Sequence, residues 1–239
     1  MSDSAAALAP RLVAEGVGTF FLVFLGIGTA LFASHLADPA GAYAPGIVHL
    51  AVAAAFGLAY LASAAAFGRV SGAHLNPAVT LAVAAAGRLR WSDAGRYALV
   101  QTIGGLVATT LLVLVGLFGA VGWLETAQNG GFASAGWGAR SAAGFDLPAA
   151  VIVELVLAAL LALVFLGDGA RHASAVGAAL TAIHLVAAPV DGGLVNPATA
   201  IATAVYGGAD ALAQVWVFAV LPLVGALAAG LARRGAAAT

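Results

Sequence analysis

The sequence predicts an all-α integral membrane protein with six transmembrane helices and two re-entrant half-helices, arranged as an inverted internal repeat. Three observations lead to this expectation: an apolar composition, six long apolar runs, and a tripeptide that occurs twice. Of the 239 residues, 63% are hydrophobic and only 8% are charged, whereas a soluble domain carries about 25% charged residues. Polar side chains are too few to cover a surface in water, so we expect most of the chain to lie in lipid.

Six apolar runs are each long enough to cross a bilayer as a helix, which takes roughly 20 residues. We expect these helices over residues 12–36, 46–67, 92–117, 148–167, 174–188 and 212–232. Turn-forming or polar segments separate them, and the longest connection covers residues 118–147. The whole chain, residues 1–239, is expected to form a single membrane domain.

The repeated tripeptide reads Asn-Pro-Ala, and each copy follows a loop that contains glycine and precedes a short apolar run. Asparagine is a favoured N-cap because its side-chain oxygen accepts an unpaired backbone N–H, and proline suits the first helical position. Each copy is therefore expected to begin a half-helix, with the amide NH2 of asparagine left free to donate. The two copies consist of Asn76, Pro77 and Ala78, and of Asn196, Pro197 and Ala198.

The two halves of the chain repeat the same order of elements, over residues 11–117 and 148–234. An acid lies early in the first span of each half, Glu15 and Glu154, and the tripeptides are 120 positions apart (196 minus 76). Three spans in each half invert the second half across the membrane, and such repeats place their site near the midplane. The half-helices should then meet at their N-termini, each of which carries roughly half a positive elementary charge.

All nine basic residues are arginines, and their placement predicts the orientation of the chain. With the N-terminus inside, the inner segments hold eight of them and the outer segments hold only Arg140. This excess predicts cytoplasmic N- and C-termini in a cell (inner or plasma) membrane. The net charge of −1 gives no reason to expect a nucleic-acid partner, and the absence of cysteine excludes thiolate metal sites. We expect no cofactor, no metal and no enzymatic activity.

Several motifs resemble the aquaporin, or major intrinsic protein, family. They are Glu-xxx-Thr at residues 15–19, Ser-Gly-Ala-His-Leu-Asn-Pro-Ala-Val-Thr at residues 71–80, Ile-His-Leu at residues 183–185, and the second Asn-Pro-Ala. The similarity extends from Arg11 to Arg234 and is greatest to bacterial water-selective members. It implies one pore per subunit, a homotetramer, and passive conduction of water past the two asparagine amides, with protons and ions excluded.

The resemblance also implies roles for the residues around the tripeptides. The two buried acids would brace the pore loops, and backbone groups of the loops would line the path. The loop residues concerned are Gly72, Ala73, His74, Gly192 and Leu194. A narrower outer constriction, the selectivity filter, would be formed by Phe56, His184, Gly193 and Thr199.

Thr199 departs from the family pattern, which has arginine at this position. Threonine is smaller and neutral, so we expect a wider and less positive constriction, with Gly193 adding further room. This leaves open a broader neutral-solute channel for glycerol, urea or trivalent metalloid acids such as arsenite. Ala200, where glycerol-conducting members usually have aspartate, argues against a standard glycerol channel. A remaining alternative is a proton-coupled secondary transporter that uses Glu15 and Glu154 as a relay.

Overall fold

The structure is a computed structural model of the chain, and it describes residues 3–34, 45–167 and 173–236. Within these ranges the secondary structure is helical throughout, without a β-strand. The long helices are α1 (Asp3–Ser34), α2 (Pro45–Ser71), α4 (Trp91–Leu117), α6 (Leu147–Leu166), α7 (Ala173–Asp191) and α9 (Ala209–Ala236). The short ones are α3 (Pro77–Ala85), α5 (Trp123–Asn129), α8 (Pro197–Ala204) and the 3-10 helix Gly138–Arg140.

Six of the described helices are long and apolar enough to cross a membrane. They match the six predicted spans, so the predicted fold class is confirmed. The half-helices α3 and α8 have 9 and 8 residues. At a rise of about 1.5 Å per residue, neither could cross the roughly 30 Å of hydrocarbon alone.

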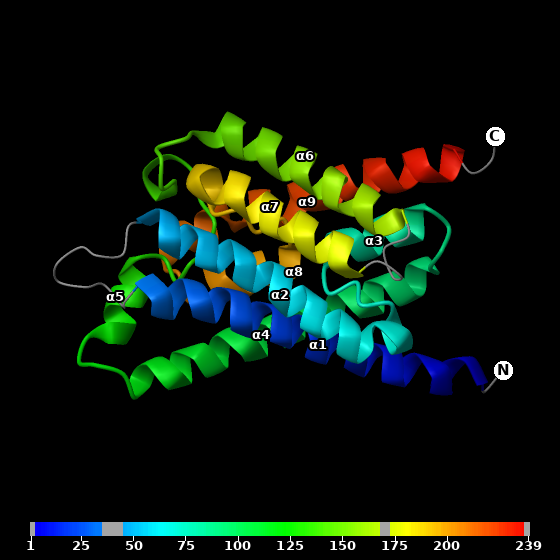
Figure 1. Cartoon of the computed structure of the whole chain (residues 1–239), viewed down its shortest axis with the longest axis horizontal. Coiled ribbons are helices and arrows are strands. Elements are labelled where there is room, and N and C mark those ends of the chain that lie inside the picture. Colours follow the sequence, from blue (N-terminus) through cyan, green and yellow to red (C-terminus); the bar gives the residue numbers. More distant parts are fainter. Residues whose placement is uncertain (1–2, 35–44, 168–172, 237–239) are drawn as a thin grey trace.

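The helices of the two halves pack in matching pairs (Figure 1). α1 packs against α2 and α4, and α6 packs against α7 and α9. Each half-helix packs against the last long helix of the other half: α3 against α9, and α8 against α4. α2 and α7 lie side by side and join the halves. The start of α1 and the end of α9 lie at the same end of the bundle, as an even number of crossings requires (Figure 1).

Glycines allow the close approach of the paired helices. A Cβ on Gly104 of α4 would collide with the backbone oxygen of Gly16 on α1. A Cβ on Gly225 of α9 would likewise collide with the backbone oxygen of Leu155 on α6. Helices in lipid gain little from hydrophobic exclusion and associate through close packing, so small residues at their crossings are expected.

Helix α7 continues past Pro189 to Asp191, whereas the sequence predicted that it would end before this proline. A proline inside a helix removes one N–H and leaves the carbonyl four residues earlier without its partner. That carbonyl belongs to Leu185, and His49 Nε2 of α2 donates to it at 3.0 Å. The lost hydrogen bond is thus replaced from the neighbouring helix, and α7 can carry its last turn to the pore loop.

Helix α5 was not predicted, because glycine and alanine dominate the sequence around it. Its first residue, Trp123, stacks on Phe32 of α1 with ring centroids 5.3 Å apart. Gly122, in the left-handed conformation, precedes it as the N-cap. The predicted loop at residues 37–45 lies almost wholly outside the described residues, as does Arg171, one of the eight inner arginines.

Candidate pore

Both half-helices begin at the asparagine of the repeated tripeptide. Asn76 Oδ1 accepts the backbone N–H of Ala78 at 2.8 Å, and Asn196 Oδ1 accepts that of Ala198 at 3.0 Å. A proline occupies the first helical position of each. The side-chain oxygens therefore face into their own helices, and both amide nitrogens face away from them.

Each asparagine amide also donates to the loop of the other half. Asn76 Nδ2 donates to the carbonyl of Val195 at 2.9 Å, and Asn196 Nδ2 donates to that of Leu75 at 3.0 Å. The expectation that the whole NH2 group is free is therefore wrong, because one of its two hydrogens ties the loops together. The second hydrogen is the one that each amide can offer to a passing molecule.

The loop before each half-helix adopts left-handed backbone conformations. For residues other than glycine, this region costs roughly 1–2 kcal/mol each. Such loops persist only where surrounding contacts hold them. The φ angles are +97° at Gly72, +50° at Ala73 and +53° at Leu75 in the first loop, and +98° at Gly192, +65° at Gly193 and +41° at Val195 in the second.

Glu15 holds the first loop in this conformation. It is fully buried, at 0% exposure, on α1. Its two carboxylate oxygens together accept four hydrogen bonds. The donors are Ser71 Oγ at 2.6 Å, the His74 N–H at 2.9 Å, the Leu75 N–H at 2.8 Å and Gln101 Nε2 at 2.8 Å. These donors come from the loop itself and from α4, so they hold both the carboxylate and the loop backbone in place.

Glu154 has fewer donors in the second loop. It is also 0% exposed. Its Oε1 accepts the Val195 N–H at 3.4 Å, and its Oε2 is buried without a hydrogen-bond partner among the described residues. The N–H of Gly193 is bound instead by Asp191 Oδ1, at 2.9 Å. The two pore loops are thus related in backbone conformation but braced by different side chains.

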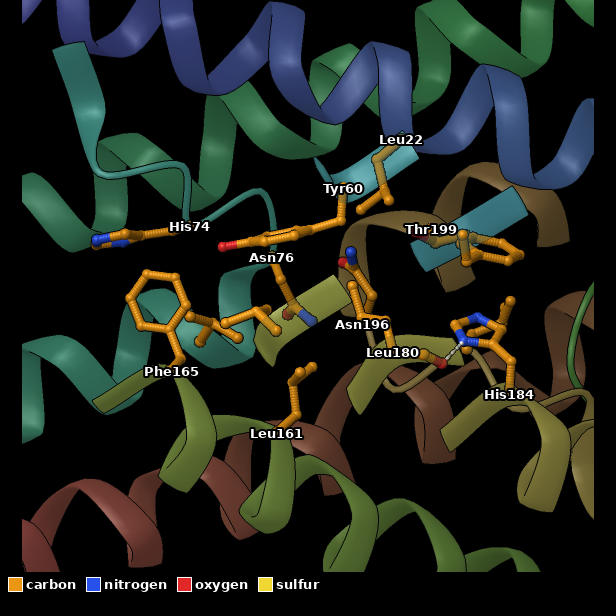
Figure 2. Close-up of a pocket in the computed structure, with 14 residues that line it drawn as sticks. Leu22, Tyr60, His74, Asn76, Leu161, Phe165, Leu180, His184, Asn196 and Thr199 are labelled. Atoms are coloured by element: carbon orange, nitrogen blue, oxygen red, sulfur yellow. Dashed lines mark hydrogen bonds between the residues drawn. The ribbon is translucent and has the colours of Figure 1, made fainter. Parts of the chain in front are cut away.

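A narrow cavity runs along the two asparagines and between the halves (Figure 2). Its volume of about 10 Å³ is close to the space that one water requires. Figure 2 shows Asn76 and Asn196 in the middle, His74 toward one end, and His184 with Thr199 toward the other. The remaining lining is largely apolar: Leu22, Phe56, Tyr60, Val79, Leu161, Phe165, Val176, Leu180 and Leu194.

At one end of the cavity the rings of Phe56 and His184 stack, with centroids 4.0 Å apart and planes 17° from parallel. Phe56 comes from α2 and His184 from α7, so the junction of the halves forms this constriction. His184 Nδ1 lies 2.8 Å from the Leu180 carbonyl and must donate to it. In the neutral ring Nε2 is then an acceptor.

Two polar atoms at the constriction have no protein partner among the described residues: His184 Nε2 and Thr199 Oγ1. Both side chains are almost fully buried, at 2% and 1% exposure. Thr199 can donate and accept, whereas Nε2 only accepts. No arginine contributes to the described cavity lining. The constriction therefore offers neutral hydrogen-bonding groups without a fixed positive charge.

Gly193 is not brought together with the other predicted filter residues. It is absent from the cavity lining, and a Cβ on it would lie 2.8 Å from the Ala188 nitrogen and 2.9 Å from Ala187 Cβ of α7. The expectation that Gly193 adds room to the constriction is therefore wrong. Glycine is needed here because of its positive φ and its contact with α7.

Gly193→Ala is expected to destabilise the protein by about 1–3 kcal/mol, from left-handed strain and the collision with α7. Gly208→Ala is the matched control, because Gly208 has φ +86° and a Cβ there would meet nothing within 4 Å. Thermal unfolding in detergent should show a clearly larger loss for Gly193→Ala. Equal losses would mean that strain alone matters and that the contact with α7 does not.

His74 contributes its side chain to the cavity, in addition to the backbone contribution expected of it. Its Nδ1 lies 3.2 Å from Thr80 Oγ1, which itself accepts from Gln101 Nε2 at 2.9 Å. The Thr80 hydroxyl can donate its hydrogen to Nδ1 or accept a second hydrogen bond from it. In the tautomer in which Thr80 donates, His74 Nε2 carries the ring hydrogen and has the polarity opposite to that of His184 Nε2.

Most of the apolar wall was not found from the sequence. Tyr60 could have been predicted to line the cavity, because it lies one helical turn after Phe56 on the same face of α2. Leu161 and Phe165 of α6 have no such signal, because every position of that helix is apolar apart from Glu154. Among the predicted loop residues, His74 and Leu194 line the cavity, whereas Gly72, Ala73 and Gly192 do not.

Comparison with known proteins agrees with this geometry. The sequence model of the major intrinsic protein family matches residues 3–233. The chain is 38% identical to an aquaporin Z of Photorhabdus laumondii over 92% of this chain and 94% of that one. It is 39% identical to an aquaporin Z of Rhodopseudomonas palustris over 94% of this chain and 92% of that one.

The fold is also similar to a solved structure, that of the aquaglyceroporin from Plasmodium falciparum. The TM-score is 0.76 and the sequence identity 23%, over 93% of this chain and 94% of that one. At this identity the likeness concerns the fold alone. The family match and the bacterial relatives together identify the chain as a member of the major intrinsic protein family.

Proposed function

We propose that this protein is a passive channel for water, with small uncharged solutes as further candidates, and that it excludes protons and ions. One observation supports this most directly: two asparagine amides, each at the N-terminus of a half-helix, face one narrow cavity. A water between them would turn its oxygen toward both amides. The positive helix ends add an electrostatic barrier to cations.

The cavity has the properties needed for rapid passage of water. Polar groups lie at intervals along an otherwise apolar wall, so a water can exchange one partner for the next without binding tightly at any of them. No step of this passage requires a residue to change its protonation state. The aquaporin Z relatives favour water as the main substrate.

A proton-coupled transporter is disfavoured by the positions of the two acids. Neither Glu15 nor Glu154 belongs to the described cavity lining, and both are 0% exposed. Glu15 is occupied by four hydrogen-bond donors. An acid in this position can brace a loop, but it does not face the cavity along which a solute would pass.

The neutral constriction supports passage of some solutes besides water. The unpartnered Thr199 hydroxyl and His184 Nε2 could bind glycerol, urea or a trivalent metalloid acid, all of which are neutral. We expect Phe56, His184 and Thr199 to set the upper limit on the size of solute that can pass. In the present conformation the stacked rings leave little room, so passage of such a solute requires Phe56 and His184 to separate.

Thr199→Arg is the test of this constriction. An arginine would add bulk and a fixed charge, so any permeability of the parent to solutes larger than water should fall at least about tenfold, which corresponds to about 1.4 kcal/mol. Stopped-flow light scattering on proteoliposomes measures both water efflux and the slower re-swelling caused by solute entry.

Thr126→Arg provides the matched control, because Thr126 is exposed on α5 away from the cavity. This control should behave like the parent for every solute. If a parent permeability to glycerol or urea is the same in Thr199→Arg, Thr199 does not lie in the filter. If the parent shows no re-swelling with any solute, the channel is restricted to water.

We extend the proposal to the assembly and its placement. Family membership supports a homotetramer with one pore in each subunit. The distribution of arginines supports cytoplasmic termini in a cell (inner or plasma) membrane. We keep residues 11–117 and 148–234 as the bounds of the inverted repeats, because the matched packing of the two halves agrees with them.

A further inference from the structure

The two pore loops correspond residue by residue, at an offset of 120. Ser71 of the first loop corresponds to Asp191 of the second, and each makes the same bond two residues along the chain. Ser71 Oγ accepts the Ala73 N–H at 3.1 Å, and Asp191 Oδ1 accepts the Gly193 N–H at 2.9 Å. Asp191 therefore takes the place of Ser71, whose hydroxyl group also makes a second hydrogen bond.

In this second hydrogen bond, Ser71 donates to the buried glutamate of its own half. Ser71 Oγ donates to Glu15 Oε1 at 2.6 Å. By the same correspondence, the second oxygen of Asp191 should face Glu154. Asp191 Oδ2 and Glu154 Oε2 are both buried without a partner among the described residues, and the two groups interact electrostatically. A carboxyl group can donate as the serine does only when it carries a proton.

The second half also lacks the other side-chain donor that the buried glutamate of the first half has. Gln101 of α4 donates to Glu15. Gly104 meets Gly16 as Gly225 meets Leu155, so α4 and α9 correspond at an offset of 121 (225 minus 104). The position on α9 that is equivalent to Gln101 is therefore Pro222, which has no side-chain donor. Among the described residues, Glu154 therefore keeps only the Val195 N–H, at 3.4 Å.

Neither acid forms an ion pair in the part of the chain that the structure describes, where both ion pairs involve Asp93. Arg140, on the connection whose Gly136 N–H donates to the Asp191 carbonyl, donates to Ser134. The helices packed against α6 and α7 are α2, α3 and α9. Leaving aside the acids themselves, the titratable or charged groups on these five helices, within the described residues, are His49, Tyr60, Arg69, His184, Asp210, Arg233 and Arg234. Of these, His49, Tyr60, His184 and Arg233 bond to backbone carbonyls.

We propose that Asp191 and Glu154 share one proton in a carboxyl–carboxylate hydrogen bond that braces the second pore loop. The pair then carries one negative charge, and its carboxyl group donates to a carboxylate as the Ser71 hydroxyl donates to Glu15. Two buried carboxylates side by side cannot both ionise at moderate cost. Asp191 is thus a positioning residue: it holds the N–H of Gly193 on one oxygen and Glu154 on the other. This role does not depend on which solute passes.

Infrared difference spectroscopy on the reconstituted protein at neutral pH tests the shared proton. A protonated carboxyl has a C=O stretch distinct from the carboxylate bands, and parent-minus-variant spectra isolate it. Asp191→Asn and Glu154→Gln each replace one partner by an amide that can donate to the remaining carboxylate. We expect the protonated-carboxyl band to be lost in both variants and kept in Glu125→Gln, which removes an exposed acid of α5.

The outcomes separate a shared proton from an independent one. If Glu154 were protonated by itself, the band would persist in Asp191→Asn; if Asp191 were, it would persist in Glu154→Gln. Persistence in either variant overturns the proposal, and so does the absence of the band from the parent. Because this measurement does not involve transport, its failure is distinguishable from failure of the proposed channel function.

Rescue by serine tests the positioning role. Asp191→Ala removes both bonds, and we expect a several-fold loss of water permeability. Asp191→Ser copies the first half, whose hydroxyl needs no shared proton, and should recover most of what alanine loses while still lacking the infrared band. Equal permeability of Asp191→Ala and the parent would contradict the positioning role.

Discussion

Gly57→Val should largely prevent accumulation of the folded channel. A Cβ on Gly57 of α2 would lie 2.6 Å from the carbonyl oxygen of Gly177 on α7 and would collide with the Thr181 side chain. Gly177 faces Gly57 in return, with a Cβ there 2.9 Å from the Gly57 oxygen. Backbone cannot retreat as a flexible side chain can, so the helices must separate. We expect a cost of at least about 3 kcal/mol, at the upper end of overpacking penalties.

The same crossing positions the constriction, because Phe56 of α2 and His184 of α7 stack immediately beside it. Any Gly57→Val protein that does fold should therefore have altered permeability as well as lower stability. Gly46→Val is the matched control in the same helix, since a Cβ on Gly46 would meet nothing within 4 Å. Membrane yield and thermal unfolding in detergent measure the effect. Equal stability of the two variants would show that the α2–α7 contact can relax.

The fold was accessible from the sequence because its main signals are large. Six apolar runs and a twice-repeated tripeptide give the number of spans and the two half-helices without any knowledge of side-chain contacts. The details that could not be predicted from the sequence depend on contacts between distant segments. Continuation of α7 past Pro189 requires His49 of another helix, and α5 is fixed by Trp123 stacking on Phe32. No local pattern encodes either contact.

The candidate pore also has features that the sequence predicts and features that it does not. Asn76 and Asn196 could be predicted as N-caps, because capping depends on neighbouring residues alone. That each amide also ties the opposite loop could not, since it depends on how the two halves meet. Gly193 was misread for a related reason. The sequence shows only that Gly193 has no side chain. The structure shows that a side chain there would collide with α7 and would not enter the cavity.

Asn76→Asp should give the channel a measurable conductance for cations. The carboxylate can still cap α3 by accepting the Ala78 N–H, so the half-helix should start at the same place. It cannot donate to Val195, however, and it places a negative charge where two helix ends together contribute roughly one positive elementary charge. At about 5 Å and an effective dielectric constant of about 20, a unit charge changes the barrier by about 3 kcal/mol, or roughly 100-fold in rate.

Cation flux into proteoliposomes, followed with a potassium- or proton-sensitive dye, measures this change. Asn129→Asp makes the same substitution at an exposed position of α5 and should leave ion exclusion intact. Asn196→Asp should reproduce the leak from the other half, because Asn196 caps α8 and donates to Leu75 as Asn76 caps α3 and donates to Val195. If both pore variants remain as impermeable to cations as Asn129→Asp, the helix ends do not provide the barrier to cations. Exclusion would then have to arise at the neutral constriction of Phe56, His184 and Thr199, where the cavity has no fixed charge and only its narrowness could act.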